Sequence, residues 1–195
     1  VRYADDFVVM CPTAQDCEQA QRRIEHVLGR LGLKLHPQKT RRVVLTEGRE
    51  GFDFLGCHMH KRMSGRLWQQ KGLRRYYLQR WPSRKAMNRV RERVRQLTPR
   101  ARCHADVRGV IAQINPVLRG WGQYFSTGNA ANQFIAVDDY VHWRLKRLQV
   151  KRAGRNLKAG RAQHWDREYF ESFGLHRLRG TIRYPGKPPG NRRAA

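Results

Sequence analysis

The hydrophobic pattern of the first forty residues predicts a short hairpin followed by an amphipathic helix. Two apolar runs, 1–4 and 7–10, flank a pair of acidic residues, which is typical of two strands joined by a tight turn. Thr13 and Asp16 form a variant of the capping box at the start of the helix, and Gly32 supplies the stop. Between them apolar residues recur at helical spacing: Cys17, Ala20, Ile24, Val27, Leu28 and Leu31.

Three further segments have the composition of short strands. Residues 33–35 and 43–45 surround the turn residues 36–38, and residues 52–58 follow a turn at 47–51. In the last segment Phe52 and Phe54 share one face of the strand, and we expect them in a core. Hairpin, helix and strands together predict an α+β layer.

The pattern becomes helical after about Gly72. Pro82-Ser83 opens a helix that Thr98-Pro99 ends, and a third helix starts near Asp138. Pro116 should kink or divide the helix between these two, near Asn115. A short helix is expected at 165–173, and the tail after Tyr184 is predicted to be disordered. The inward positions of the three long helices are Met87, Val90, Val94 and Leu97, then Val107, Val110, Ile111, Ile114, Leu118 and Trp121, then Val141, Leu145 and Leu148.

The net charge of the chain indicates which class of partner it binds. With 41 Lys and Arg against 15 Asp and Glu, the net charge is +26, which favours nucleic acid. A ribosomal-type structural RNA binder, or a merely soluble basic surface, would have the same composition. The sequence contains no run of about 18 apolar residues, so no membrane span is predicted. The four cysteines form no Cys-x-x-Cys pair, so we expect a reducing compartment and a cytoplasmic protein.

Two groups of basic residues fall at helical spacing and contain few acids to balance them. Solvated faces usually mix both signs, so backbone contact with RNA is the favoured interpretation, and an ordinary solvated face is the alternative. Folded RNA would be held mainly through its shape and its phosphates. The first group is Arg84, Arg91 and Arg95, and the second, predicted to point outward, is Arg144, Arg147 and Lys151.

The acidic pair Asp5-Asp6 is the strongest candidate for a catalytic metal site. A tight turn would place both carboxylates at the end of the hairpin, side by side and poorly neutralised. Oxygen ligands select hard cations, above all Mg²⁺, and two Mg²⁺ about 4 Å apart form the clamp of polymerases. The alternative is an ordinary turn, because Asp often stabilises turns through its own backbone.

Four motifs carry a family resemblance. Tyr3-Ala4-Asp5-Asp6 resembles the Tyr-x-Asp-Asp palm hairpin of reverse transcriptases, and residues 35–40 resemble the loop after their palm helix. Residues 51–56, Gly-Phe-Asp-Phe-Leu-Gly, resemble their Gly-Phe-x-Phe-Leu-Gly strand, which helps hold the primer end. Residues 115–125 resemble the maturase signature of group II intron proteins. The chain therefore resembles the C-terminal part of a bacterial group II intron-encoded reverse transcriptase/maturase.

The resemblance implies the end of a palm over 1–71, a thumb-like helical segment over 72–98, a maturase domain over 99–184 and a basic tail over 185–195. Asp5 and Asp6 would be catalytic metal ligands, with two Mg²⁺ in the complete site. Lys39 would neutralise or protonate the leaving pyrophosphate, although an exposed loop lysine is the alternative. Nucleic-acid contacts are implied at Tyr3 and Gly56, although the glycines at 51 and 56 also mark turns.

The side chains of the maturase signature could either pack inside the protein or contact RNA. Trp121, Tyr124 and Phe125 fall at helical spacing, and we expect packing rather than base stacking. Arg119 is either an RNA contact or a member of a structural ion pair.

The partners implied are group II intron RNA, an RNA template with a DNA primer, and dNTP; the parent could also be a homodimer. Because the chain opens inside a hairpin, we expect it to be part of a longer protein whose earlier palm strand supplies a further Asp. The parent would be an RNA-directed DNA polymerase and splicing maturase, and this chain alone would bind RNA without synthesising DNA. The alternatives are a splicing-only maturase with a vestigial polymerase site, and a retron-type reverse transcriptase.

Overall fold

The computed structural model describes residues 1–183, which form two compact units: Val1–Val44, and a second that begins at Leu45. The boundary at 44 and 45 falls inside the segment 1–71 expected to form a palm, and the domain limits drawn from the sequence stay predictions. The tail 185–195, expected to be disordered, lies outside the described residues.

The first unit contains a hairpin and one amphipathic helix, as predicted. β1 (Arg2–Tyr3) pairs antiparallel with β2 (Asp6–Phe7), and α1 spans Ala14–Arg30. The Thr13 hydroxyl accepts the N–H of Asp16 at 3.1 Å and donates to the Asp16 carboxylate at 2.7 Å, which confirms the predicted cap. At the other end Gly32 has φ 68°, the left-handed conformation that closes helices.

The strands predicted at 33–35 and 43–45 are wrong. Within residues 1–183, neither segment joins a sheet, and the backbone between α1 and β3 contains only turns, a short 3₁₀ helix η1 (Thr46–Gly48) and irregular chain. An extended segment becomes a strand only when a neighbour completes its backbone hydrogen bonds. A local apolar pattern does not reveal whether that neighbour is present.

The single strand predicted over 52–58 is a hairpin instead. β3 (Gly51–Phe54) and β4 (Cys57–Met63) pair antiparallel around Leu55 and Gly56, whose φ values are 48° and 75°. Two successive positive φ values are those of the tight turns that match the twist of paired strands. Phe52 and Phe54 are half-buried on this hairpin and are not members of the core expected for them.

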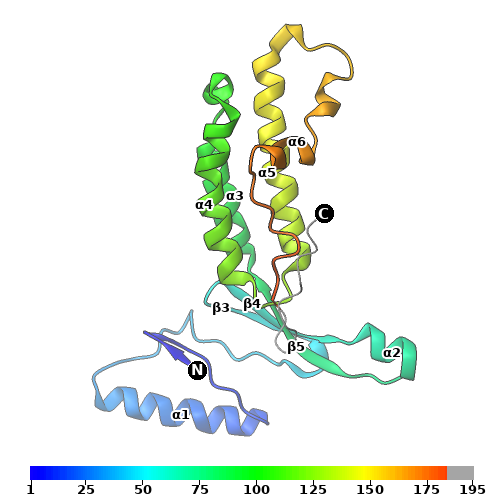
Figure 1. Ribbon diagram of the computed structural model, residues 1–195. Helices are drawn as coiled ribbons and strands as arrows, with labels where there is room; N and C mark the ends of the chain where they lie inside the picture. The colour runs from blue at the N-terminus through cyan, green and yellow to red at the C-terminus, as the bar shows by residue number, and fades with distance from the viewer. Residues whose placement is uncertain (184–195) are drawn as a thin grey trace. The chain divides into compact units, whose positions relative to one another are not determined.

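Two elements of the second unit were not predicted. After β4 comes α2 (Gly65–Lys71), and then β5 (Tyr76–Pro82), which pairs antiparallel with β4 along its whole length. The sheet order is therefore β3-β4-β5. Figure 1 shows the β4–β5 ribbon extending away from the helices, with α2 at its far end.

Three long helices hold the core of the second unit (Figure 1). They are α3 (Arg84–Leu97), α4 (Val107–Phe125) and α5 (Ala131–Ala153), and α3 packs against both of the others. α5 begins seven residues before the predicted start at Asp138. The predicted inward residues are confirmed as buried, except that Leu97 and Trp121 are half-buried at the core's edge: Met87, Val90, Val94, Val107, Val110, Ile111, Ile114, Leu118, Val141, Leu145 and Leu148.

Pro116 does not divide α4. The helix runs from Val107 to Phe125 through the proline, which lies on its exposed side. Ile114 and Leu118 on either side are fully buried. Packing of the apolar face therefore outweighs the backbone hydrogen bond that proline cannot donate.

The chain after α5 folds back along the helices. Short 3₁₀ helices at Gly154–Asn156 (η3) and Arg161–His164 (η4) lead to α6 (Arg167–Ser172), which confirms the short helix expected at 165–173; another, η2 (Arg100–His104), links α3 to α4. The Asp138 carboxylate on α5 accepts the N–H groups of Leu178 and Arg179 at 3.0 and 2.9 Å, fixing this last segment. Burial raises the pKa of Asp138, although these two hydrogen bonds act in the opposite direction. No helix among residues 1–183 is long and apolar enough to cross a membrane.

Candidate functional site

The β1–β2 hairpin presents the two candidate metal ligands at an exposed tip. Tyr3 pairs with Asp6 in the ladder, and Ala4 and Asp5 make the turn, with φ 51° at Ala4. Hydrogen bonds of 2.8 Å in both directions between Val1 and Val8 extend the pairing beyond the assigned strands. The hairpin is therefore a closed ladder whose end displays one carboxylate in the turn and the next on the strand.

The donor chemistry of this tip fits Mg²⁺. Asp5 and Asp6 are exposed, and no ion pair within residues 1–183 neutralises either carboxylate. Mg²⁺ is commonly held by one or two carboxylates together with waters and substrate phosphates. Within residues 1–183 no third acidic, histidine or cysteine side chain joins Asp5 and Asp6 in a cluster.

Lys39 lies in a turn of the first unit. Its backbone N–H donates to the carbonyl of His36 at 3.1 Å, and its side chain is exposed. No contact within the described residues joins its amine to Asp5 or Asp6. Its role toward pyrophosphate stays a prediction.

Gly56 occupies a turn that the second unit holds from two sides. The carbonyl of Gly56 accepts the N–H of Ser83 at 2.8 Å, and the carbonyl of Leu55 accepts the Tyr124 hydroxyl at 2.8 Å. The Phe125 ring would lie 3.7 Å from a side chain added at Gly56. The β3–β4 turn is thus fixed to the start of α3 and to the end of α4.

Gly51 is enclosed even more tightly. A Cβ built there would lie 2.6 Å from the imidazole of His58 and 2.8 Å from the carbonyl of Met59. Both glycines of the motif therefore have a structural requirement: one for the turn conformation and one for close approach.

The cysteine beside this turn is shielded rather than reactive. Burial raises the pKa of the Cys57 thiol, and the nearby Arg80 guanidinium offsets this only in part. A raised pKa keeps the thiol protonated near neutral pH and therefore weakly nucleophilic.

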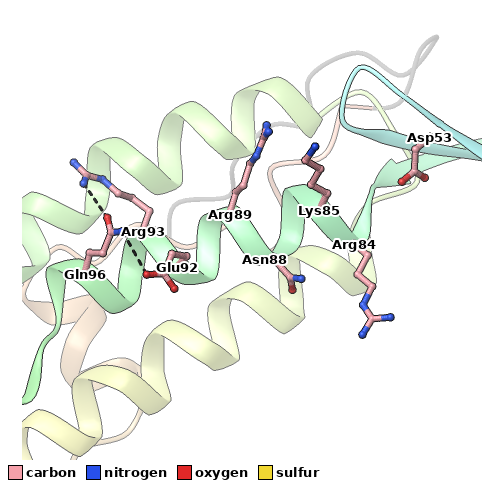
Figure 2. A pocket seen from close by; sticks show the side chains of 8 residues that line it. All are labelled: Asp53, Arg84, Lys85, Asn88, Arg89, Glu92, Arg93 and Gln96. Atoms are coloured by element: carbon pink, nitrogen blue, oxygen red, sulfur yellow. Dashed lines mark hydrogen bonds between the residues drawn. The ribbon is translucent and has the colours of Figure 1, made fainter. Parts of the chain in front are cut away.

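An open groove of about 750 Å³ runs along the exposed side of α3 (Figure 2). Four cations line it against two acids, and both acids are already engaged. Asp53 pairs with His58 at 2.6 Å, and Glu92 pairs with Arg95 at 2.7 Å. The lining side chains are Asp53, Arg84, Lys85, Asn88, Arg89, Glu92, Arg93 and Gln96.

The predicted basic stripe of Arg84, Arg91 and Arg95 is only partly exposed. Arg84 lines the groove, whereas Arg91 is half-buried and its guanidinium lies 6.0 Å from the ring of Tyr140 on α5. The prediction missed Lys85, Arg89 and Arg93, which lie on the side of α3 turned away from the core. Spacing alone does not indicate which of two adjacent basic faces meets a neighbouring helix.

The predicted outward stripe on α5 is wrong at Arg144. This residue is half-buried, and its guanidinium donates to the Thr98 hydroxyl at 2.9 Å and to the carbonyls of Arg95 and Thr98 at the end of α3. Arg147 and Lys151 are exposed as expected, and the Arg147 guanidinium lies 4.8 Å from the Trp143 ring.

The side chains of the maturase signature are mostly packed, as expected. Trp121 lies 4.9 Å from the ring of Phe125 and 5.4 Å from that of Phe134. Tyr124 differs, because the residue is 59% exposed while its hydroxyl donates to the Leu55 carbonyl in the β3–β4 turn. Arg119 is exposed and forms no ion pair within residues 1–183, which argues against the structural ion pair, and the RNA contact stays a prediction.

Two family models match the chain. The model for reverse transcriptase (RNA-dependent DNA polymerase) matches residues 1–59, and the model for the group II intron maturase-specific domain matches residues 87–170. The chain belongs to the group II intron reverse transcriptase/maturase family. The α+β arrangement of a palm end followed by a helical domain, expected from the sequence, agrees with these matches. No curated protein matches the chain.

The two family matches cover different elements of the chain. The polymerase match contains the Asp5-Asp6 hairpin and the β3 strand, and the maturase match runs from within α3 to within α6. Residues 60–86, which include α2 and β5, lie between the two matches.

Proposed function

We propose that this protein binds the RNA of a group II intron and assists its splicing, and that its palm hairpin serves RNA-directed DNA synthesis. The observation that carries the proposal is the basic groove on α3. Lys85, Arg89 and Arg93 recur every four residues and form a row on α3, Arg84 lies beside the start of this row, and the acids next to them are already paired. Phosphates of a folded RNA would complete such a row.

The polymerase part rests on the hairpin. Asp5 and Asp6 would hold Mg²⁺, which when bound supplies Lewis-acid activation of the primer hydroxyl and stabilises charge on the phosphoryl group. The ladder between β1 and β2 keeps the two carboxylates on one short rigid element, and their exposure leaves them open to substrate. A splicing-only maturase would dispense with both carboxylates, so their presence favours the polymerase.

The groove is tested by the salt dependence of RNA affinity. We would compare the wild type with the variant R84A/K85A/R89A/R93A, using group II intron RNA over a range of salt concentrations. Each phosphate contact contributes roughly 0.7–0.9 to the slope of log affinity against log salt. The variant should therefore lose about three units of slope.

A matched control removes four exposed cations of the first unit, R22A/R23A/R30A/K34A. It lowers the net charge equally and should change the slope by less than about one unit. Equal losses in both variants would contradict a built groove and indicate a diffuse attraction between a basic chain and RNA.

A further inference from the structure

The β4–α2–β5 segment forms an arm, defined here as residues 61–80. Its base is held at Arg80, which forms hydrogen bonds with Thr127 and Asn129 in the loop between α4 and α5, and the rest of the arm stands apart from the core. No residue of α2 is buried, and the core cluster begins only at Ala86, with Cys57 packed at its edge. The backbone of Ser64 donates to the Arg75 carbonyl at 2.8 Å, and Gly72 ends α2 with φ 63°. The arm is thus a closed ribbon with a one-helix tip, and both family matches leave it out.

The arm is basic without any acidic counterpart. No Asp or Glu occurs between Asp53 and Glu92, a stretch that contains the whole arm. Most basic side chains of the arm are exposed. They are Lys61, Arg62, Arg66, Lys71, Arg74, Arg75 and Arg80.

Aromatic rings are exposed among these cations. Trp68 on α2 is 43% exposed and Tyr77 on β5 is 47% exposed. The guanidinium of Arg74 lies 5.3 Å from the Trp68 ring, which orients the indole and places a cation beside it. On the β4–β5 ladder, Arg62 pairs with Tyr77 across the strands, so a cation and a ring share one face.

We propose that the arm binds single-stranded RNA, with Trp68 and Tyr77 as stacking surfaces for unpaired bases. The inference rests on the proposed RNA-binding function and adds a second contact site to it. Cations that track a phosphate backbone, interleaved with exposed rings, are the combination used for single strands. A duplex hides its base faces, so the rings would contribute nothing to it. A second copy of this chain, at +26, would be repelled.

The test uses the whole chain and two labelled probes, a 20-nucleotide oligo(U) RNA and an RNA hairpin with a similar number of phosphates. Trp68→Ala should weaken oligo(U) binding about tenfold and leave hairpin binding within about twofold. Trp68→Phe keeps a ring and should restore most of the affinity. Leu73→Ala is the matched control, because Leu73 is an apolar side chain of the same arm, 52% exposed, without a ring.

Three results would overturn the proposal: an unchanged oligo(U) affinity in Trp68→Ala, equal losses for oligo(U) and the hairpin, or an equal loss in Leu73→Ala. Binding to anionic lipid vesicles that requires Trp68, with oligo(U) binding unaffected, would instead identify a membrane surface as the occupant. Failure of the proposed intron function would appear differently, as a wild-type protein that binds intron RNA no better than unrelated RNA. The two failures are therefore separable.

Discussion

Arg144 reaches from α5 to the C-terminal end of α3, where the backbone N–H of Thr98 already donates to the Arg95 carbonyl at 3.2 Å. Its guanidinium donates to the carbonyls of Arg95 and Thr98 and to the Thr98 hydroxyl. A cation at a helix C-terminus also meets the negative end of the helix dipole. A residue predicted from its spacing to contact RNA therefore joins two helices of the protein.

Arg144→Ala should lower the free energy of unfolding by about 1.5–3 kcal/mol, because the charged hydrogen bonds to the Thr98 hydroxyl and to the Thr98 carbonyl are lost. Arg147→Ala, on the same helix but exposed, should change it by less than about 0.5 kcal/mol. Denaturant unfolding followed by circular dichroism measures both. Equal effects would show that the Arg144 contacts contribute nothing to stability.

Asp5 and Asp6, unlike Arg144, are not expected to contribute to stability, since neither carboxylate has a structural partner in the described chain. Asp5→Asn, in the longest natural form of this protein, should reduce primer extension on an RNA template by a factor of about 10²–10³. Its RNA affinity and its unfolding temperature should remain those of the wild type. The control Asp16→Asn removes a carboxylate of the same unit that lies outside the hairpin, and it should leave primer extension intact. Near-normal extension in Asp5→Asn would show that Asp5 and Asp6 only stabilise a turn and bind no catalytic metal.

At the scale of elements, the β3–β4 turn shows how the two family matches are joined physically. The turn belongs to the polymerase match, while Tyr124, whose hydroxyl holds the Leu55 carbonyl, belongs to the maturase match. The resemblance implies that the motif 51–56, which contains this turn, helps hold the primer end. If that role holds, α4 would be a positioning element for it through Tyr124.

Tyr124→Phe removes that one hydrogen bond and keeps the ring. We expect amide exchange at Gly56 and Cys57 to accelerate severalfold, while global stability falls by no more than about 1.5 kcal/mol. Tyr140→Phe, a half-buried tyrosine of α5, serves as the control and should leave exchange at the turn unchanged. Uniform acceleration along the whole chain would indicate general destabilisation and not the loss of a specific tie.

The elements that could be predicted from the sequence are those whose signals are local. The cap of Thr13 with Asp16 and the apolar stripe of α3 each lie within one helix, and both are confirmed. The β3–β4 turn was missed because Leu55 takes a positive φ that its residue type does not suggest. The groove cations Lys85, Arg89 and Arg93 were missed because the exposed face of α3 depends on where α4 and α5 pack.

For the whole molecule, the distribution of charge matters more than its total. The acid-free stretch from residue 54 to 91 includes the arm and the start of α3, so the arm and the groove are adjacent in sequence within one basic region. A chain of net charge +26 attracts any polyanion, so RNA binding by itself is no evidence for a specific role with a group II intron. Preference between RNAs of equal length is what distinguishes the proposed function.

The most direct measurement is therefore the equilibrium affinity for the group II intron RNA of the protein's own genetic locus, against an unrelated folded RNA of the same length at the same salt concentration. We expect at least about tenfold tighter binding to the intron RNA, because specific complexes exceed generic electrostatic attraction. The variant R84A/K85A/R89A/R93A should reduce this preference. Equal affinity for the two RNAs would contradict the proposed intron function and indicate a basic chain that binds RNA without selectivity.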